Sequence, residues 1–139
     1  IFIQADVTKA KDIDSMVSQS ISQFGRVDIL FNNAGINPPE ARTHLADCQE
    51  PAWDAVIEVN VKGIYRCSKK VLPLMIQNRR GVIINTSSTF GLVGYAARSA
   101  YVASKGAVTQ LTKAMAVDYG PYNIRVNCIC PGMVLTSGG

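Results

Sequence analysis

The sequence has 139 residues, which is long enough to bury one hydrophobic core and fits a single domain. Hydrophobic residues make up 47% of the chain and charged residues 17%, which is typical of a globular protein, and no stretch reaches the ~20 apolar residues of a membrane-spanning helix. The net charge of +4 comes from scattered basic pairs rather than from one cluster, so we expect neither a nucleic acid nor a membrane as a partner.

Four cysteines occur, at Cys48, Cys67, Cys128 and Cys130. The last two are separated by one residue, and we expect them to alternate across a strand and not to converge as the sulfurs of a Cys-x-x-Cys zinc site do. The sequence therefore predicts free, mostly buried thiols in a reducing compartment, a cytoplasmic location and no metal site.

The chain opens with a predicted strand and a predicted helix. The apolar run Ile1–Ala5 predicts the last part of a strand. Thr8 is placed to cap a helix that runs to about Phe24, with Ile13 and Val17 on its apolar face.

The middle of the chain predicts a strand at residues 28–32, followed by a loop. Residues 36–50 contain two prolines and show no periodicity. Pro51 suits the first turn of a long helix that reaches about Met75, and we expect Pro73 to break that helix near its end.

The last part of the chain predicts a strand at residues 82–86, a helix from Ser99 or Ala100 to about Tyr119, and a strand at Ile124–Ile129. Strands that alternate with helices predict an α/β fold with a doubly wound parallel sheet. The strands are apolar throughout, which favours a sheet covered on both faces, in three α/β/α layers. We expect residues 1–139 to form one partial catalytic domain without a second domain.

Unusual residues follow each predicted strand. They are Asp6-Val7, Asn32-Asn33-Ala34-Gly35, Ser87-Ser88 and Pro131-Gly132. Parallel sheets bind ligands beyond the carboxyl ends of their strands. The sequence therefore predicts one crevice into which four strand ends point.

Tyr101 and Lys105 are four residues apart near the start of a predicted helix, so their side chains share one face. A free tyrosine has a pKa of about 10, so proton transfer near neutral pH requires stabilisation of its phenolate. A lysine cation ~4–5 Å away supplies roughly 3–4 kcal/mol at an effective dielectric of ~20. The pair is a candidate for general acid–base chemistry, although the same spacing taken alone also fits an ordinary surface pair.

Several motifs occur together in a recognisable order and spacing. They are Asn32-Asn33-Ala34-Gly35, Asn60, Ser88 thirteen residues before Tyr101, Tyr101-x-x-x-Lys105 and Pro131-Gly132. Over essentially its whole length the chain resembles the short-chain dehydrogenase/reductases, in the single-domain branch that carries Asn-Asn-Ala-Gly. The resemblance implies a Rossmann-like fold.

The resemblance also implies a role for each catalytic residue. Tyr101 would exchange a proton with the substrate oxygen, and Ser88, with Ser87 as its nearest rival, would hold and polarise that oxygen. Lys105 would support Tyr101 and bind the nicotinamide ribose, and Asn60 would fix a water that relays protons from Lys105 to solvent.

The cofactor would be NAD or NADP, and the resemblance implies which residues bind it. Asp6 and Val7 would contact the adenine, and the turn Asn33-Ala34-Gly35 would run beneath the adenosine ribose. The nicotinamide end would be bound by Tyr101, Lys105, Pro131, Gly132, Val134 and Thr136.

Two elements of the family pattern are absent from this sequence. The glycine-rich phosphate-binding loop would precede Ile1, and the residue that separates NAD from NADP is missing with it. We therefore expect a fragment that lacks its N-terminal loop and its C-terminal part, and we expect residues 1–139 alone to be inactive.

The resemblance implies an NAD(P)-dependent oxidoreductase that transfers a hydride between nicotinamide and a small carbonyl or alcohol substrate. Within the family the motifs are most similar to 3-oxoacyl-carrier-protein reductases and to sugar or polyol dehydrogenases. An epimerase or dehydratase of the extended branch and a non-catalytic cofactor-binding regulator are the alternatives. We expect a homodimer or homotetramer formed through the two long helices.

Overall fold

A computed structural model describes residues 1–133 of the chain. Its strands are β1 (Ile29–Asn32), β2 (Gly81–Thr86) and β3 (Ile124–Ile129). Its α-helices are α1 (Ala10–Phe24), α2 (Glu50–Ile57), α3 (Gly63–Asn78) and α4 (Ser99–Tyr119). A π-helical turn, Glu58–Lys62, joins α2 to α3, and four short 3-10 turns lie at Pro39–Ala41, Leu45–Asp47, Thr89–Gly91 and Gly120–Tyr122.

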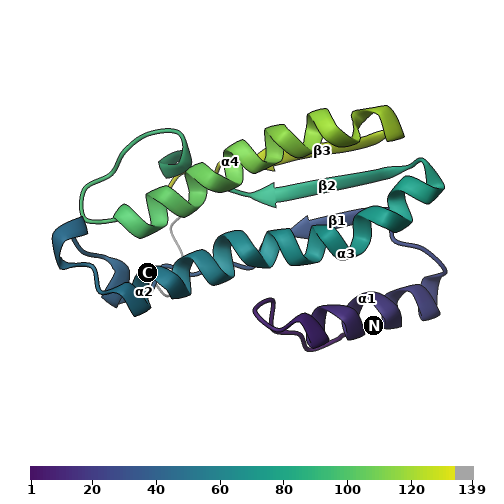
Figure 1. The fold of residues 1–139 in the computed structure, drawn as a ribbon, viewed down its shortest axis with the longest axis horizontal. Helices are drawn as coiled ribbons and strands as arrows, with labels where there is room; N and C mark the ends of the chain where they lie inside the picture. The colour runs from purple at the N-terminus through teal and green to yellow at the C-terminus, as the bar shows by residue number, and fades with distance from the viewer. Residues whose placement is uncertain (134–139) are drawn as a thin grey trace.

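The three strands form one parallel sheet in the order β1-β2-β3. In Figure 1 the three arrows point toward the same end of the molecule, so their carboxyl ends share one edge. Because neighbouring strands are parallel, each connection must cross back over the sheet, and α3 and α4 are the helices that do so.

The helices of the described residues cover one face of the sheet. Leu30, Ile83 and Val126 stand side by side in the register and belong to the hydrophobic core, which α3 and α4 complete. Ile29 and Phe31 alternate with them, face the other way and are 63% and 52% exposed. The predicted α/β fold with a parallel sheet is confirmed.

The main core lies between the sheet and the helices. Helix α3 packs against β1 and β2, α4 packs against β3, and α1 lies beside α3 (Figure 1). The buried residues of this core come from α1, α3 and α4 and from the strands. Among them are Ile13, Val17, Val71, Met75, Ile83, Met115, Ile124 and Val126. A second, smaller cluster joins Ala41, Val56 and Ala100.

The start of the chain differs from the prediction in two respects. Ile1–Ala5 does not form a strand among the described residues, because no neighbouring strand offers it backbone hydrogen bonds; Phe2 is 91% exposed. Thr8 does not cap a helix. It donates its hydroxyl proton to Asp6 Oδ1 (2.7 Å), and α1 begins at Ala10 with Lys9 as an N-cap that makes no side-chain bond.

Pro73 does not break the long helix, which continues as α3 to Asn78. A proline in a helix interior removes the bond to the carbonyl oxygen four residues earlier, here that of Lys69. Pro73 and Lys69 are both exposed, so water can satisfy that carbonyl oxygen. Among residues 1–133 no helix is long and apolar enough to cross a membrane.

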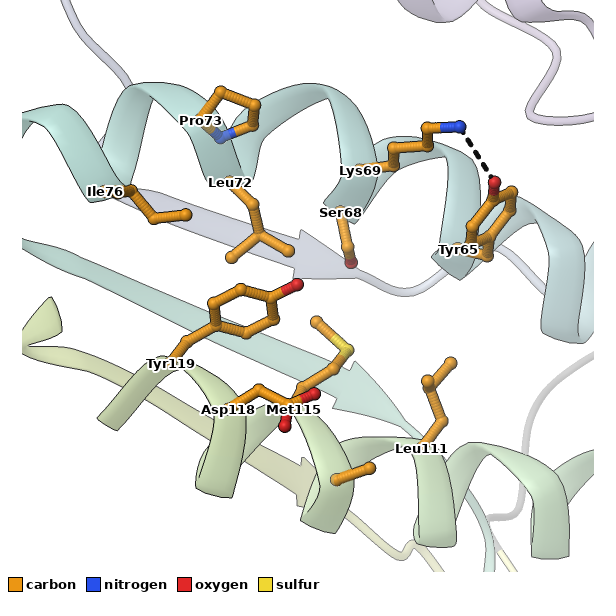
Figure 2. Close-up of a pocket in the computed structure, with 11 residues that line it drawn as sticks. Tyr65, Ser68, Lys69, Leu72, Pro73, Ile76, Leu111, Met115, Asp118 and Tyr119 are labelled. Carbon is orange, nitrogen blue, oxygen red and sulfur yellow. Dashed lines mark hydrogen bonds between the residues drawn. The ribbon is translucent and has the colours of Figure 1, made fainter. Parts of the chain in front are cut away.

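A groove of about 370 Å³ lies between α3 and α4 (Figure 2). Leu72 and Ile76 from α3 face Leu111 and Tyr119 from α4 across it. At one end the Lys69 ammonium donates a hydrogen bond to the Tyr65 hydroxyl (3.0 Å). The groove is therefore mainly apolar with polar side chains at its margin.

Candidate active site

The side chain of Lys105 is held beneath Tyr101 at the start of α4. Lys105 is only 4% exposed, and its Nζ donates a hydrogen bond to the Thr86 carbonyl oxygen at the end of β2 (2.8 Å). The same nitrogen lies 5.5 Å from the centre of the Tyr101 ring. Burial lowers the pKa of Lys105, because desolvation disfavours the ammonium.

Ser88 and Ser87 have separate environments. Ser87 is 2% exposed and is hydrogen-bonded to the Lys105 carbonyl oxygen (2.9 Å) and the Thr109 hydroxyl (2.8 Å). Ser88 lines the same cavity as Tyr101, and among residues 1–133 its Oγ accepts one hydrogen bond, from Phe90 N–H (3.2 Å). Of the two serines, Ser88 is the one whose hydroxyl can reach a ligand.

The cavity that holds Ser88 and Tyr101 has a volume of about 430 Å³. Gly132, from the Pro131-Gly132 motif, also lines it, and the Pro131 carbonyl oxygen accepts a hydrogen bond from Thr89 N–H (3.0 Å). Residues from the segment after β2, from α4 and from the segment after β3 thus meet at the carboxyl edge of the sheet.

Asn60 is fully buried at the centre of the π-helical turn. Its Oδ1 accepts from Ile36 N–H (2.8 Å), and its Nδ2 donates to the Ile36 carbonyl oxygen (3.0 Å) and the Ser104 hydroxyl (3.0 Å). The side chain therefore fixes the backbone that follows Asn-Asn-Ala-Gly and joins it to α4.

Gly35 lies close to both Asn60 and Lys105. A Cβ atom at Gly35 would be 3.3 Å from Asn60 Oδ1 and 3.5 Å from Lys105 Nζ. The first contact is tight and the second is ordinary van der Waals contact, so glycine at this position leaves more space beside the lysine than a larger residue would.

A second cavity, of about 140 Å³, lies between β1, the turn that follows it, and α3. Val7, Asn33 and Ala34 line it, and the Thr86 hydroxyl donates a hydrogen bond to Asn33 Oδ1 (3.0 Å). Asn32 also lines this cavity, but it is buried, and its Nδ2 donates to Asn85 Oδ1 (2.8 Å). Within the motif, Asn32, Asn33 and Ala34 all line the cavity, and Asn32 in addition joins β1 to β2.

The carboxylate of Asp6 binds residues that follow it closely in the sequence. Its carboxylate accepts hydrogen bonds from Thr8 N–H (2.9 Å) and the Thr8 hydroxyl (2.7 Å), and it pairs with Lys9 (3.3 Å). These hydrogen bonds, the backbone one first, lower the pKa of Asp6. Its side chain does not line the cavity of Val7, so the structure separates these two neighbouring residues.

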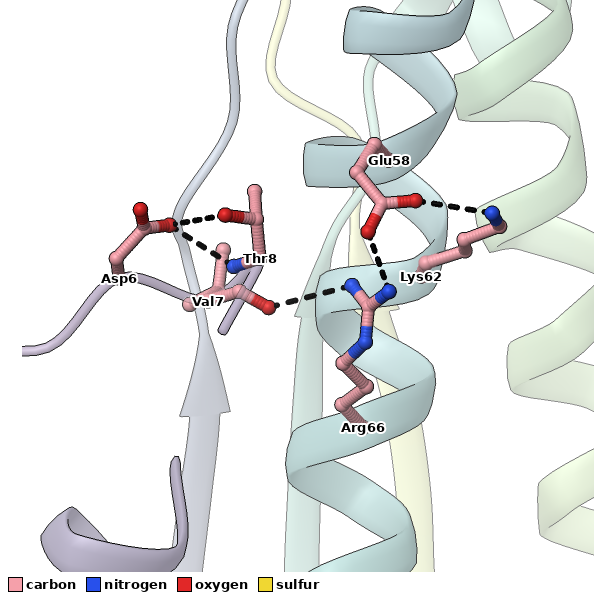
Figure 3. Close-up of polar contacts among 6 residues, drawn as sticks. All are labelled: Asp6, Val7, Thr8, Glu58, Lys62 and Arg66. Carbon is pink, nitrogen blue, oxygen red and sulfur yellow. Dashed lines mark hydrogen bonds and ion pairs between the residues drawn. The ribbon is translucent and has the colours of Figure 1, made fainter. Parts of the chain in front are cut away.

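An ionic cluster at the π-helical turn and the start of α3 binds the segment that contains Val7 (Figure 3). Arg66 donates to the Val7 carbonyl oxygen (3.5 Å) and pairs with Glu58, which also pairs with Lys62 (2.9 Å). The hydrogen bonds from Lys62 and then Arg66 lower the pKa of Glu58. The Glu58–Lys62 spacing is visible in the sequence, but its connection to Val7 depends on the fold.

The two neighbouring cysteines converge, contrary to the prediction. Cys128 Sγ lies 3.9 Å from Cys130 Sγ. Residues two apart on an extended chain point to the same side, so the expected alternation was wrong. Both thiols are free, and burial raises the pKa of Cys128.

Two arginines in the larger cavity were not predicted. Arg42, from the loop before α2, and Arg98, at the start of α4, line it together with Ser88 and Tyr101. They are far apart in the sequence and belong to no motif, so only the fold could reveal that they meet. Val134 and Thr136, which the resemblance placed at the nicotinamide, lie outside the described residues.

Comparison with known families gives one match that covers nearly the whole chain. The family model for short chain dehydrogenases matches residues 1–138. A 2-(R)-hydroxypropyl-CoM dehydrogenase of Xanthobacter autotrophicus is 43% identical over 96% of this chain and 54% of its own length. The L-fucose dehydrogenase of Bos taurus is 41% identical over 98% of this chain and 49% of its own length. A 3-oxoacyl-(acyl-carrier-protein) reductase FabG of Staphylococcus epidermidis is 40% identical over 96% of this chain and 54% of its own length.

Solved structures agree with these relatives. ElxO with NADP bound superimposes with a TM-score of 0.94 at 33% identity, over 99% of this chain and 55% of that one. NAD⁺-bound xylitol dehydrogenase superimposes with a TM-score of 0.91 at 37% identity, over 96% of this chain and 51% of that one. The chain thus spans about half the length of the relatives that it matches.

Proposed function

Since this chain belongs to the short-chain dehydrogenase family, we propose that its protein is an NAD(P)-dependent oxidoreductase that interconverts a carbonyl and an alcohol. The observation that carries the proposal is the cavity in which Ser88 and Tyr101 meet, with the Lys105 ammonium 5.5 Å from the centre of the Tyr101 ring. The likeness to reductases and sugar dehydrogenases supports the same reaction class.

The residues present fit a dinucleotide laid across the carboxyl edge of the sheet. The adenosine end would lie at Val7, Asn33 and Ala34, with Asp6 beside them, and Gly35 leaves space beside Lys105 for a ribose. The nicotinamide end would lie near Pro131 and Gly132, with Val134 and Thr136 next along the chain. Parallel sheets bind ligands at this edge in general.

The side chains would divide the proton chemistry among them. When bound, the nicotinamide supplies or accepts the hydride. During reduction the Ser88 hydroxyl would donate a hydrogen bond to the carbonyl oxygen, and the Tyr101 hydroxyl would transfer its proton to that oxygen. The Lys105 ammonium would stabilise the resulting phenolate and bind the ribose. Asn60 would hold the relay of protons to Lys105 in place.

Replacing Tyr101 tests this proposal. In the full-length protein, Tyr101→Phe should reduce turnover by about 10²–10⁴-fold or more and leave cofactor affinity nearly unchanged, because only the proton-carrying hydroxyl is lost. Lys105→Ala should weaken both. Tyr122→Phe, outside the cavity, is the matched control. Steady-state kinetics with cofactor titration decide the outcome, and a fully active Tyr101→Phe enzyme would contradict the mechanism.

We also propose a cytoplasmic homodimer or homotetramer that pairs copies through α3 and α4. The groove between these helices supports this, because Leu111, Met115 and Tyr119 of α4 line it, while Val108 of the same helix is buried in the molecule. Apolar residues of α4 therefore serve both internal packing and the groove. The four free thiols suit a reducing compartment.

A further inference from the structure

The cavity beside Tyr101 is positively charged. Arg42 and Arg98 enter it from two different elements, the loop before α2 and the start of α4. Among the described residues that line the cavity none is an aspartate or a glutamate. Arg42 and Arg98 therefore line a space of about 430 Å³ together with Ser88 and Tyr101, and none of its described lining residues is a carboxylate that could neutralise them.

Both guanidinium groups retain donors for a ligand. Arg42 Nε donates to the Asn37 carbonyl oxygen (2.9 Å), and Arg98 Nη1 donates to the Ala97 carbonyl oxygen (2.7 Å). Neither forms an ion pair with an acidic residue of the described chain, whereas Arg26 and Arg66 both do. A guanidinium has five N–H donors, so most of them are available at each site.

The backbone adds to the positive potential. Arg98 is the N-cap of α4, a helix of 21 residues, and it makes no side-chain cap bond there. The first N–H groups of a helix are unpaired and carry partial positive charge, which favours an anion. Arg98 and the helix start thus act in the same direction at the same place.

We propose that the substrate carries, besides its carbonyl or alcohol, an anionic group that Arg42 and Arg98 bind. The proposal rests on the proposed function, because Ser88 and Tyr101 fix where the reacting oxygen lies. A carboxylate, sulfonate or phosphate accepts paired N–H bonds from a guanidinium, which is the chemistry offered here. Val7 and Asn33 line the other cavity, where we propose that the adenosine end of the cofactor lies, and we therefore assign the two arginines to the substrate, which would share their cavity with the nicotinamide end.

Matched substrate pairs test the proposal on the full-length enzyme. Acetoacetate is compared with acetoacetamide, and dihydroxyacetone phosphate with dihydroxyacetone, each with NADH and with NADPH. The enzyme should reduce an anionic member at least 10-fold more efficiently than its neutral match, measured as kcat/KM. Arg42→Gln and Arg98→Gln should each lower kcat/KM for that anion by about 10–100-fold, mainly through KM, because a hydrogen bond to a charged group is lost.

Neutral substrates provide the internal control. The two variants should reduce the neutral members within about 3-fold of the wild-type rate, Arg98→Lys should recover part of the lost efficiency, and Arg125→Gln, outside the cavity, should change neither. Equal rates on both members of every pair, or arginine variants that affect both alike, would overturn the inference while leaving the oxidoreductase standing. Absence of turnover with every pair and with a panel of neutral ketones would instead count against the proposed function, and the inference would fail with it.

Discussion

Gly91 brings the loop that carries Ser88 directly against α4. A Cβ atom at this position would lie 2.6 Å from the Lys105 carbonyl oxygen and 2.6 Å from Ser87 Oγ. Both atoms are fixed, the first in the helix backbone and the second in a buried hydrogen bond. The position therefore requires glycine because of the close approach of two backbones.

Gly91→Ala should destabilise the protein by about 1–3 kcal/mol, because the loop must move away from α4 to admit the methyl group. The same displacement should lower turnover, since Ser88 moves with the loop. Gly94→Ala is the matched control, because a Cβ there meets nothing within 4 Å. Urea unfolding and kcat are measured for both variants, and equal stabilities would show that the loop accommodates the methyl group freely.

At the scale of single residues, the sequence predicts the site residues that belong to a motif with a characteristic spacing. Tyr101 and Lys105 are one helical turn apart, so local geometry alone brings them together. Arg42 and Arg98 are far apart in the sequence, so local geometry does not indicate that they line the same cavity. The convergence of Cys128 and Cys130 was available from strand geometry and was missed, because the side-chain alternation was applied to the wrong spacing.

Among the elements, α3 supports the segment before α1 through Arg66. The Arg66 guanidinium reaches the Val7 carbonyl oxygen and is held in place by Glu58 (Figure 3). Because the folded-state pKa of Glu58 is lowered, the ionised form that binds Arg66 persists at neutral pH. It is lost only as the pH falls below the ordinary range of a glutamate.

Arg66→Gln should raise the KM for the cofactor by about 3–10-fold and change kcat little, because Val7 lines the proposed adenosine cavity and Ser88 and Tyr101 are untouched. Lys70→Gln is the control. It removes the Lys70–Asp14 pair (2.6 Å), which also joins α3 to α1 but is exposed and so contributes little. Equal KM values for the two variants would exclude a positioning role for Arg66.

Elements with a strong local signal were predicted nearly to the residue. The strand Ile124–Ile129 and the helix that ends at Tyr119 match their predicted bounds. Ile1–Ala5 reads as a strand but does not form one here, since a strand depends on its neighbour rather than on its own composition. Pro73 was misjudged because the sequence does not reveal that it and Lys69 face solvent.

At the scale of the whole molecule, two apolar surfaces stand out in residues 1–133. One is the uncovered face of the sheet, with Ile29 and Phe31, and the other is the groove between α3 and α4. Exposed apolar surface of this extent is typical of a face that another part or another copy of a protein covers. The groove is the surface that we assign to a second copy.

Ala114→Glu should shift the full-length protein toward the monomer, because it places a carboxylate in the groove next to Asp118. Lys113→Glu introduces the same residue on the same helix outside the groove and should leave the mass unchanged. Light scattering measures both. A monomeric wild-type protein, or an unchanged mass for Ala114→Glu, would refute pairing through this groove.

The π-helical turn Glu58–Lys62 also has a geometric consequence for the rod that runs from Glu50 to Asn78. A π turn holds about one residue more than an α turn, and each residue of an α-helix advances by roughly 100°. The helical wheel of α3 is therefore offset from that of α2. The offset directs Val56 into the small cluster with Ala41 and Ala100, and Val71 into the main core. Deleting one residue from the π-helical turn would rotate the buried face of α3 relative to the buried face of α2. A deletion in the loop that precedes α2 would leave the relative rotation of the two helices unchanged.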